Sequence, residues 1–166
     1  SLTVANIESI HKSLLRFTLD SGIAGQIRTA QNWIGRNSHS PRNATYIPPP
    51  PEHVSALLED LCVFMNRQDL PGVVQAAIAH GQFETIHPFA DGNGRVGRCL
   101  VHTVLIRQGL APRYVPPISL ILSGRARQYI EGLVDFRDGR VDEWIELFAD
   151  ATCLAARQAE RLADEI

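Results

Sequence analysis

The chain has 166 residues, of which 45% are hydrophobic and 20% are charged. That length suits one globular domain with a single core, and the composition argues against a disordered, collagen-like or membrane protein. A net charge of −2 provides no overall positive field that would attract nucleic acid. We therefore expect any anionic ligand to be held by a local cluster of positive groups.

The three cysteines, Cys62, Cys99 and Cys153, are odd in number and form no CxxC pair. Their spacing argues against a disulfide framework or a zinc site and fits a reducing, cytoplasmic location. No hydrophobic run approaches membrane-spanning length, and no signal-peptide pattern opens the chain. Because an amphipathic pattern is already under way at Ser1, we expect the natural protein to be longer than this sequence.

Hydrophobic residues recur at helical spacing over residues 4–18, and the pattern stops at Asp20. Residues 26–47 place β-branched and aromatic residues on either side of a polar, turn-forming centre, which predicts a β-hairpin with a long tip. The proline run 48–51 predicts a stiff extended spacer. A helix is expected to begin where this run ends, because proline fits the first turn of a helix.

Five more helices are predicted from hydrophobic spacing and from the positions of glycine and proline. They cover residues 52–66, 71–84, 99–109, 118–136 and 141–162. The helix over 99–109 is apolar on nearly every side, which is typical of a helix inside a bundle. The sequence therefore predicts an all-α domain with one hairpin, without internal repeats or a second domain.

Residues 87–98, HPFADGNGRVGR, combine groups suited to phosphate chemistry. Gly92 and Gly94 permit backbone conformations in which successive N–H groups converge on one anion. The segment then leads into a helix N-terminus, which attracts phosphate through free amides and a positive dipole end. Arg95 and Arg98 are three residues apart and therefore share one face of that helix.

Two further residues of this segment suggest chemical roles. Asp91 lies at the mouth of the loop, where it could hold a hard cation such as Mg²⁺ between its carboxylate and a phosphate. His87 precedes it by four residues, and an imidazole can accept a proton from an attacking hydroxyl near neutral pH. Each residue alone would be interpreted as a solvated or capping group. Their coincidence around the two glycines favours a phosphate-transfer site.

The same segment resembles the signature of the Fic family, H-x-F-x-[D/E]-G-N-G-R-x-x-R, and matches it at every specified position. The similarity extends over about residues 4–150. Residues 25–28 and 32–35 resemble the family's flap, a hairpin beside the active site. Tyr129 and Trp144 lie where the family has a tyrosine pair and a tryptophan. The resemblance implies a Fic-type helical bundle with one β-hairpin flap.

Such a domain, spanning residues 1–166, would transfer AMP from ATP to a Ser, Thr or Tyr hydroxyl of a target protein or of itself. The resemblance implies that His87 is the general base, that Asp91 holds Mg²⁺ against the α- and β-phosphates, and that Arg98 reaches the γ-phosphate. The family pattern assigns nucleotide binding also to Gly92, Asn93, Gly94, Arg95, Val96, Gly97, Ile34, Gly35, Arg36, Asn37, Tyr129, Ile130 and Arg137.

The flap would pair with an extended segment of the target protein by strand addition, using Gln31, Asn32 and Trp33. Trp33 fits either an exposed target contact or packing within the hairpin. Fic proteins commonly carry, or borrow from a partner, an inhibitory helix with the pattern [S/T]-x-x-x-E-[G/N]. This sequence does not contain that pattern. The resemblance therefore implies an inhibitory helix upstream of Ser1 or on an antitoxin-like partner that contacts Arg98.

Two departures from the family pattern leave alternatives open, and one of them is that the segment between Ser123 and Tyr129 is about one helical turn shorter than in relatives. Many relatives have two adjacent tyrosines where this chain has Tyr129 and Ile130, so the resemblance implies the phosphate chemistry but leaves the preferred base of the nucleotide open. The transferred group could then be UMP or a phosphate-linked alcohol, taken from another donor. A catalytically silent domain that binds nucleotide or protein is the other alternative. No nucleic acid or membrane is expected as a partner of this domain.

Overall fold

The computed structural model describes residues 1–35, 41–111 and 117–164. The chain divides into two compact units, and each is described by itself. The first comprises residues 1–66 and 82–99, and the second comprises residues 67–81 and 100–166. Two helices contribute to both units, namely α3 (Gly72–Ile86) and α4 (Asn93–Arg107).

The first unit contains α1 (Val4–Leu15) and α2 (Pro51–Met65), which pack together. Pro51 lies in the first turn of α2, as predicted from the proline run. Helix α1 ends three residues earlier than its hydrophobic pattern predicts. The Thr18 hydroxyl donates a hydrogen bond to the Leu15 carbonyl at 2.9 Å and satisfies an acceptor at the end of α1. Phe17, the last apolar residue of the pattern, is exposed.

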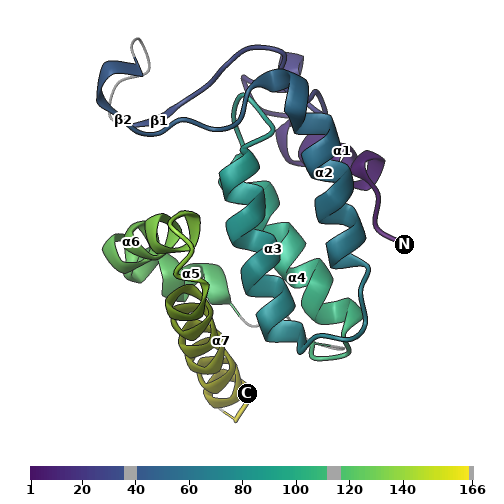
Figure 1. The fold of residues 1–166 in the computed structure, drawn as a ribbon. Coiled ribbons are helices and arrows are strands. Elements are labelled where there is room, and N and C mark those ends of the chain that lie inside the picture. The colour runs from purple at the N-terminus through teal and green to yellow at the C-terminus, as the bar shows by residue number, and fades with distance from the viewer. Residues whose placement is uncertain (36–40, 112–116, 165–166) are drawn as a thin grey trace. The chain divides into compact units, whose positions relative to one another are not determined.

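The expected hairpin is confirmed, although its strands are short. Strand β1 (Ile34–Gly35) pairs antiparallel with β2 (Ala44–Tyr46), with an irregular register between them. Figure 1 shows the hairpin at the end of two lengths of chain that lead away from α1 and α2. The prediction that the first strand begins near residue 26 is wrong. Residues 26–33 are not in a ladder, because side chains and the Pro88 carbonyl bind this segment instead.

Two short 3₁₀ turns lie in this part of the chain, at Ser21–Ile23 and, directly before β2, at Pro41–Asn43.

The core of the first unit is apolar and includes Ile7, Leu15 and Leu58, which are all fully buried. Phe83, near the end of α3, meets Phe89 with ring centroids 6.3 Å apart.

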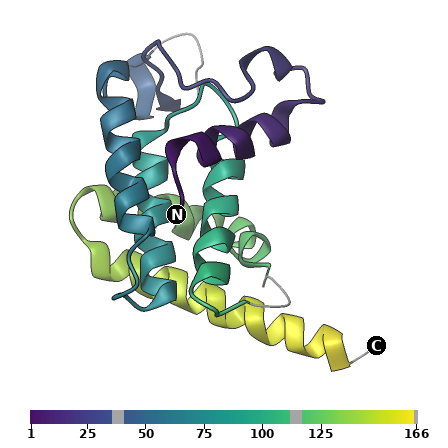
Figure 2. The same ribbon diagram turned by 90° about the vertical axis from the view of Figure 1, so that its right-hand side faces the viewer.

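The second unit contains α5 (Ile118–Gly124), α6 (Ala126–Arg137) and α7 (Val141–Asp164), which pack on one another (Figures 1 and 2). One helix was predicted over residues 118–136, but the chain breaks between α5 and α6 at Arg125, whose φ of −117° and ψ of 35° are not helical. Gly132 allows α6 to approach α7 closely, because a Cβ there would lie 2.8 Å from Leu147.

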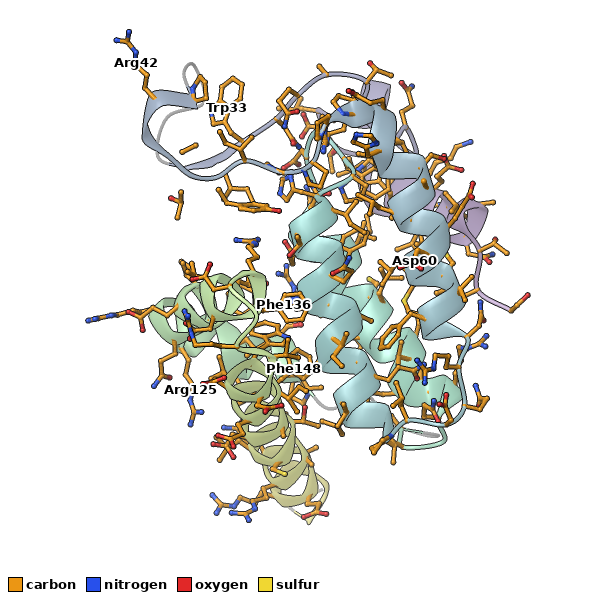
Figure 3. The ribbon with its side chains drawn as sticks, viewed as in Figure 1. Trp33, Arg42, Asp60, Arg125, Phe136 and Phe148 are labelled. Carbon is orange, nitrogen blue, oxygen red and sulfur yellow. The ribbon has the colours of Figure 1, made fainter. Side chains whose placement is uncertain are left out.

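Aromatic residues join α6 and α7 to the first half of α3 within this unit. Trp144 is fully buried and donates a hydrogen bond from its indole to the Ala77 carbonyl at 2.7 Å. Phe136 and Phe148 point toward α3 (Figure 3). None of the described helices is both long enough and apolar enough to cross a lipid bilayer. The predicted all-α fold with one hairpin is confirmed.

Candidate active site

Two residues with unusual backbone conformations bracket the loop between α3 and α4. His87 has φ of 47°, in the left-handed region that a residue with a side chain rarely adopts. Gly92 has φ of 81°, and a Cβ there would lie 3.2 Å from the His11 ring. The glycine was predicted for its backbone freedom, which is confirmed. A strained conformation at His87 is typical of functional sites.

Asn93 is only 3% exposed, and its side chain closes this loop. Its Oδ1 accepts a hydrogen bond from the Phe89 N–H at 2.9 Å, and its Nδ2 donates to the Phe89 carbonyl at 2.8 Å. The Asn93 side chain therefore shapes the loop. A contribution of Asn93 to an anion hole would come from its backbone N–H, because the first N–H groups of a helix have no intrahelical acceptor.

A hollow of about 290 Å³ lies over the loop and the first two turns of α4, within the first unit. It brings together most of the predicted site residues, and its lining consists of His87, Ala90, Asp91, Gly92, Asn93, Gly94, Arg95 and Arg98. Val96 and Gly97 are buried and are not part of this lining. The predicted clustering of base, carboxylate, helix N-terminus and arginines in one place therefore agrees with the structure.

Gly94 contributes in a different way from the one predicted. It is the second residue of α4 and does not have a positive φ. A Cβ at this position would lie 3.3 Å from Nη1 of Arg98, so the missing side chain leaves room for that guanidinium. Among the described residues, no carboxylate lies within ion-pairing distance of Arg98. Its positive charge can therefore face the hollow.

Asp91 and Arg95 already contact each other, with Nη2 of Arg95 2.6 Å from Oδ2 of Asp91. Both side chains are substantially exposed, at 55% and 40%. Within the described ranges no three His, Cys, Asp or Glu side chains are grouped as metal ligands. A single exposed carboxylate beside a helix N-terminus is a group that could hold Mg²⁺, which is commonly bound by one or two carboxylates together with substrate phosphates.

The imidazole of His87 is held by two amide side chains. Nδ2 of Asn32 lies 3.0 Å from Nδ1 of His87, and Nδ2 of Asn93 lies 3.3 Å from the same atom. Asn32 was predicted to contact the target protein. That stays a prediction, and in the structure its side chain turns toward His87 and also donates to the Phe89 carbonyl at 3.1 Å.

Arg28 holds the main chain around His87, a role that the sequence did not predict. The residue is only 6% exposed, and its side-chain hydrogen bonds to the described residues all go to backbone carbonyls. These acceptors are His87 at 2.9 Å, Pro49 at 2.6 Å, and Ile86 and Ala30 at 3.3 Å each. Burial lowers the pKa of Arg28. The cation also lies at the C-terminal end of α3, where the helix dipole is negative.

His11 supports the loop from α1 and was likewise not predicted. Its Nδ1 accepts a hydrogen bond from the Gly25 N–H at 2.9 Å, and its Nε2 lies 3.0 Å from the Asp91 carbonyl. Its ring stacks on Phe89 with a centroid distance of 3.8 Å. Burial lowers the pKa of His11, so the neutral ring with its proton on Nε2 satisfies both contacts. The available signal was a polar residue on the buried face of α1.

The rest of the flap lies beside this loop in the first unit. Gln31 donates a hydrogen bond to the Pro48 carbonyl at 2.8 Å, and Trp33 is half-buried. A second hollow, of about 310 Å³, has Gln31, Asn32 and Ala90 in its wall. Of the positions predicted to border the nucleotide, Ile34 and Gly35 form β1. Arg36 and Asn37 lie outside the described residues.

The remaining predicted positions, Tyr129, Ile130 and Arg137, lie on α6 in the second unit. The Tyr129 hydroxyl is 2.9 Å from Nε2 of His80, within the aromatic cluster around Trp144. Ile130 is 54% exposed, and Arg137 is half-buried.

Residues 1–105 match the family model described as the Fic/DOC family. The chain is 32% identical over 131 residues to "Protein adenylyltransferase fic-1" of Caenorhabditis elegans, covering 77% of this chain and 23% of that relative. It is 29% identical over 154 residues to "Protein adenylyltransferase Fic" of Drosophila grimshawi, covering 91% of this chain and 29% of that relative. The chain therefore spans less than a third of the length of these curated relatives.

Solved structures show the same fold. The crystal structure of a Fic family protein from Desulfovibrio desulfuricans has a TM-score of 0.78 and 25% identity, covering 99% of this chain and 49% of that one. A fragment of Fic-1 from C. elegans has a TM-score of 0.67 and 27% identity, covering 95% of this chain and 42% of that fragment.

Proposed function

The chain belongs to the Fic/DOC family, and on that premise we propose that it is a protein adenylyltransferase, which transfers AMP from ATP to a hydroxyl of a protein. The observation that carries this proposal is the hollow over the start of α4. There a histidine, an exposed carboxylate, a helix N-terminus and two arginines face one space. A scaffold or binding module would not need all of these groups together.

The nucleotide phosphates would bind at the first turn of α4. Free N–H groups at a helix N-terminus, together with the dipole, favour negative charge. Arg98 has space beside Gly94 to reach the γ-phosphate, and Arg95 lies on the same side of the hollow. Bound Mg²⁺, held by Asp91, would supply charge neutralisation at the phosphates.

The chemical step is one substitution at phosphorus. The target hydroxyl oxygen forms a bond to the α-phosphorus, and the bond from that phosphorus to the oxygen bridging the β-phosphate breaks. Pyrophosphate leaves with the electron pair, and the hydroxyl proton passes to the His87 ring. Arg95 and Arg98 stabilise the negative charge that accumulates on the leaving pyrophosphate, because guanidinium groups bind phosphate oxygens in pairs.

The flap would present the target next to this base. Asn32 bonds the His87 ring, and the second hollow follows the same extended segment. An extended target strand could therefore pair along residues 26–33 and bring its hydroxyl toward His87, with backbone contacts that read little sequence. Tyr129, Ile130, Arg137, Ile34 and Gly35 are proposed to border the nucleotide, as the family pattern implies.

We further propose that residues 1–166 form a single Fic domain within a longer cytoplasmic protein. Continuity of α3 and α4 through both compact units supports a single domain. The lack of a carboxylate partner for Arg98 among the described residues fits an inhibitory helix that is supplied from elsewhere.

Incubation with Mg²⁺ and ATP labelled on the α-phosphate tests the proposed function. We expect label on the protein itself or on an added target, with the mass of one AMP by mass spectrometry. ATP binding without any label would favour the silent module. Stronger labelling from another nucleotide in a competition series would indicate a different donor.

A further inference from the structure

The amide of Asn32 determines which nitrogen of the His87 ring carries the proton. The Asn32 atom nearest to Nδ1 of His87, at 3.0 Å, also lies 3.1 Å from the Phe89 carbonyl and 3.4 Å from the His87 carbonyl. An oxygen in that position would face two other oxygens. The atom is therefore the NH₂ group, and amide orientation is assigned from such a network.

An NH₂ group has no lone pair to offer to a ring N–H. Asn32 must therefore donate to Nδ1 of His87, and the weaker contact from Asn93 at 3.3 Å also comes from an NH₂ group. A neutral imidazole has one donor and one acceptor nitrogen. Because Nδ1 accepts, the proton of the neutral ring is on Nε2, and Nε2 cannot take a proton from a hydroxyl in this form.

We propose that Asn32 is a positioning residue that holds His87 in this resting tautomer, so that AMP transfer requires the Asn32 amide to turn. This inference rests on the proposed function of His87 as the base. After the turn, which also has to carry the amide away from the Phe89 and His87 carbonyls, Oδ1 of Asn32 accepts the Nδ1–H of His87, and the lone pair moves to Nε2. The ring keeps the same number of protons, because solvent takes up the proton from Nε2 and supplies one to Nδ1.

Three features of its surroundings make the turn of the Asn32 amide feasible. Oδ1 of Asn32 is buried and has no hydrogen-bond partner among the described residues, so the turn gives this atom a donor. The Phe89 carbonyl, which loses Asn32, keeps the Asn93 amide at 2.8 Å. The His87 carbonyl keeps Nε of Arg28 at 2.9 Å. The turn therefore leaves neither carbonyl without a donor, which would be costly in a buried site.

The location of Asn32 connects this switch to the target. Asn32 lies on the extended segment along which the target is proposed to pair, between Gln31 and Trp33. Docking on this segment would move the amide that holds the base. In serine proteases, replacing the carboxylate that accepts from the base by an amide lowers kcat about 10⁴-fold, because the ring takes the wrong tautomer. In this chain, the Asn32 amide contacts Nδ1 of His87, the ring position that the carboxylate contacts in those proteases.

The substitution Asn32→Asp tests the proposal, because a carboxylate accepts from Nδ1–H and never donates to it. We expect two-bond ¹H–¹⁵N spectra of the histidine rings to show His87 of the unaltered chain with its proton on Nε2, identified by loss of the signal in His87→Ala. Asn32→Asp should move that proton to Nδ1 and raise the rate of AMP transfer at least about tenfold.

Two controls separate the tautomer from other effects. Asn32→Leu removes the donor without adding an acceptor, so its transfer rate should stay below that of Asn32→Asp. Thr29→Asp places the same charge on an exposed position of the segment and should leave the ring tautomer unchanged. A proton on Nδ1 in the unaltered chain would overturn the proposal, as would an Asn32→Asp rate no higher than that of Asn32→Leu. The spectra decide this even if the chain transfers no AMP, in which case only the proposed function fails.

Discussion

Arg95 donates a hydrogen bond to Asp91 across 2.6 Å, and so joins the proposed metal ligand to one of the proposed phosphate-binding groups. A cation that binds Asp91 has to share the carboxylate with this guanidinium or displace it. Both side chains are substantially exposed, so the pair itself contributes little to stability, on the order of 1 kcal/mol or less. Replacing the Arg95 guanidinium by Mg²⁺ as the partner of the Asp91 carboxylate should therefore have a low energetic cost.

Asp91→Ala should abolish the tightening of ATP binding by Mg²⁺ and should abolish transfer with it, because carboxylate and phosphates share the cation. Isothermal titration with ATP, in the presence of Mg²⁺ and then of a chelator, measures the effect. Asp60→Asn, on the exposed surface of α2 (Figure 3), serves as the matched control and should behave like the unaltered chain. Equal tightening by Mg²⁺ in Asp91→Ala would show that Asp91 is not the ligand.

His87→Ala should lower the transfer rate by about 10²–10⁴-fold while ATP affinity stays nearly unchanged, because the imidazole acts on the nucleophile. Because residue 87 has a positive φ, His87→Asn is a useful second variant, since asparagine tolerates that conformation better than alanine. His53→Ala, at an exposed position on α2, controls for the loss of an imidazole elsewhere. Label incorporation at the normal rate by both His87 variants would refute the assignment.

Arg98→Ala should weaken the binding of ATP but not of ADP, because the guanidinium is proposed to contact the γ-phosphate alone. The ratio of the two dissociation constants is the readout, and ADP is the internal control. A helix that supplies a glutamate to Arg98 should compete with ATP in the same way, since carboxylate and phosphate use the same paired donors. An equal loss of affinity for both nucleotides would place Arg98 nearer the α- or β-phosphate.

Arg28→Met should lower the free energy of unfolding by at least about 2 kcal/mol, because buried carbonyls lose their donor. That corresponds to a fall in Tm of about 4–8 °C for a chain of this size. Arg28→Lys should recover little of the loss, since a single ammonium cannot reach carbonyls on four residues. Arg127→Met is the control, because Arg127 is 90% exposed and should change Tm only slightly. A similar Tm for the Arg28 and Arg127 variants would contradict the structural role.

Acid should destabilise the fold through His102. Burial lowers the pKa of His102 below its ordinary 6.5, so the unfolded chain takes up this proton at a higher pH than the folded chain does. Stability from the neutral ring is complete above 6.5 and is lost as pH falls through the folded-state pKa. Urea unfolding at about pH 7.5 and about pH 5.5 should therefore show a smaller loss in His102→Gln than in the unaltered chain. An identical loss in both would contradict the shift.

The segment 87–98 was the easiest part of the site to predict, because its residues are neighbours in sequence and a helix N-terminus fixes their geometry. Its supporting residues were harder to predict, since Arg28 and His11 reach the loop from 59 and 80 positions away. Only His11 had a signal, as a polar residue at helical spacing between Ile7 and Leu15. Nothing in the sequence around Arg28 indicates that its partners would be carbonyls.

Some helix boundaries could be predicted from the sequence, and others could not. Pro51 marks the start of α2 chemically, and that prediction is confirmed. The end of α1 depends on whether Phe17 is buried, which hydrophobic spacing alone does not determine. The break at Arg125 depends on local backbone angles that hydrophobic periodicity does not determine. The target-facing role predicted for Asn32 rested on its place in the flap and stays a prediction, and the sequence did not indicate that its side chain would also bond the ring of His87.

The acceptors of Arg28 have a consequence for how this residue would appear among relatives. All four are main-chain carbonyls, a group that every amino acid carries. Ala30, Pro49 and Ile86 can therefore change in evolution without any compensating change at Arg28. Methods that infer contacts from correlated substitutions would find no correlated positions for it. A position that is constant yet coupled to nothing is the pattern we expect at Arg28 in an alignment of homologues.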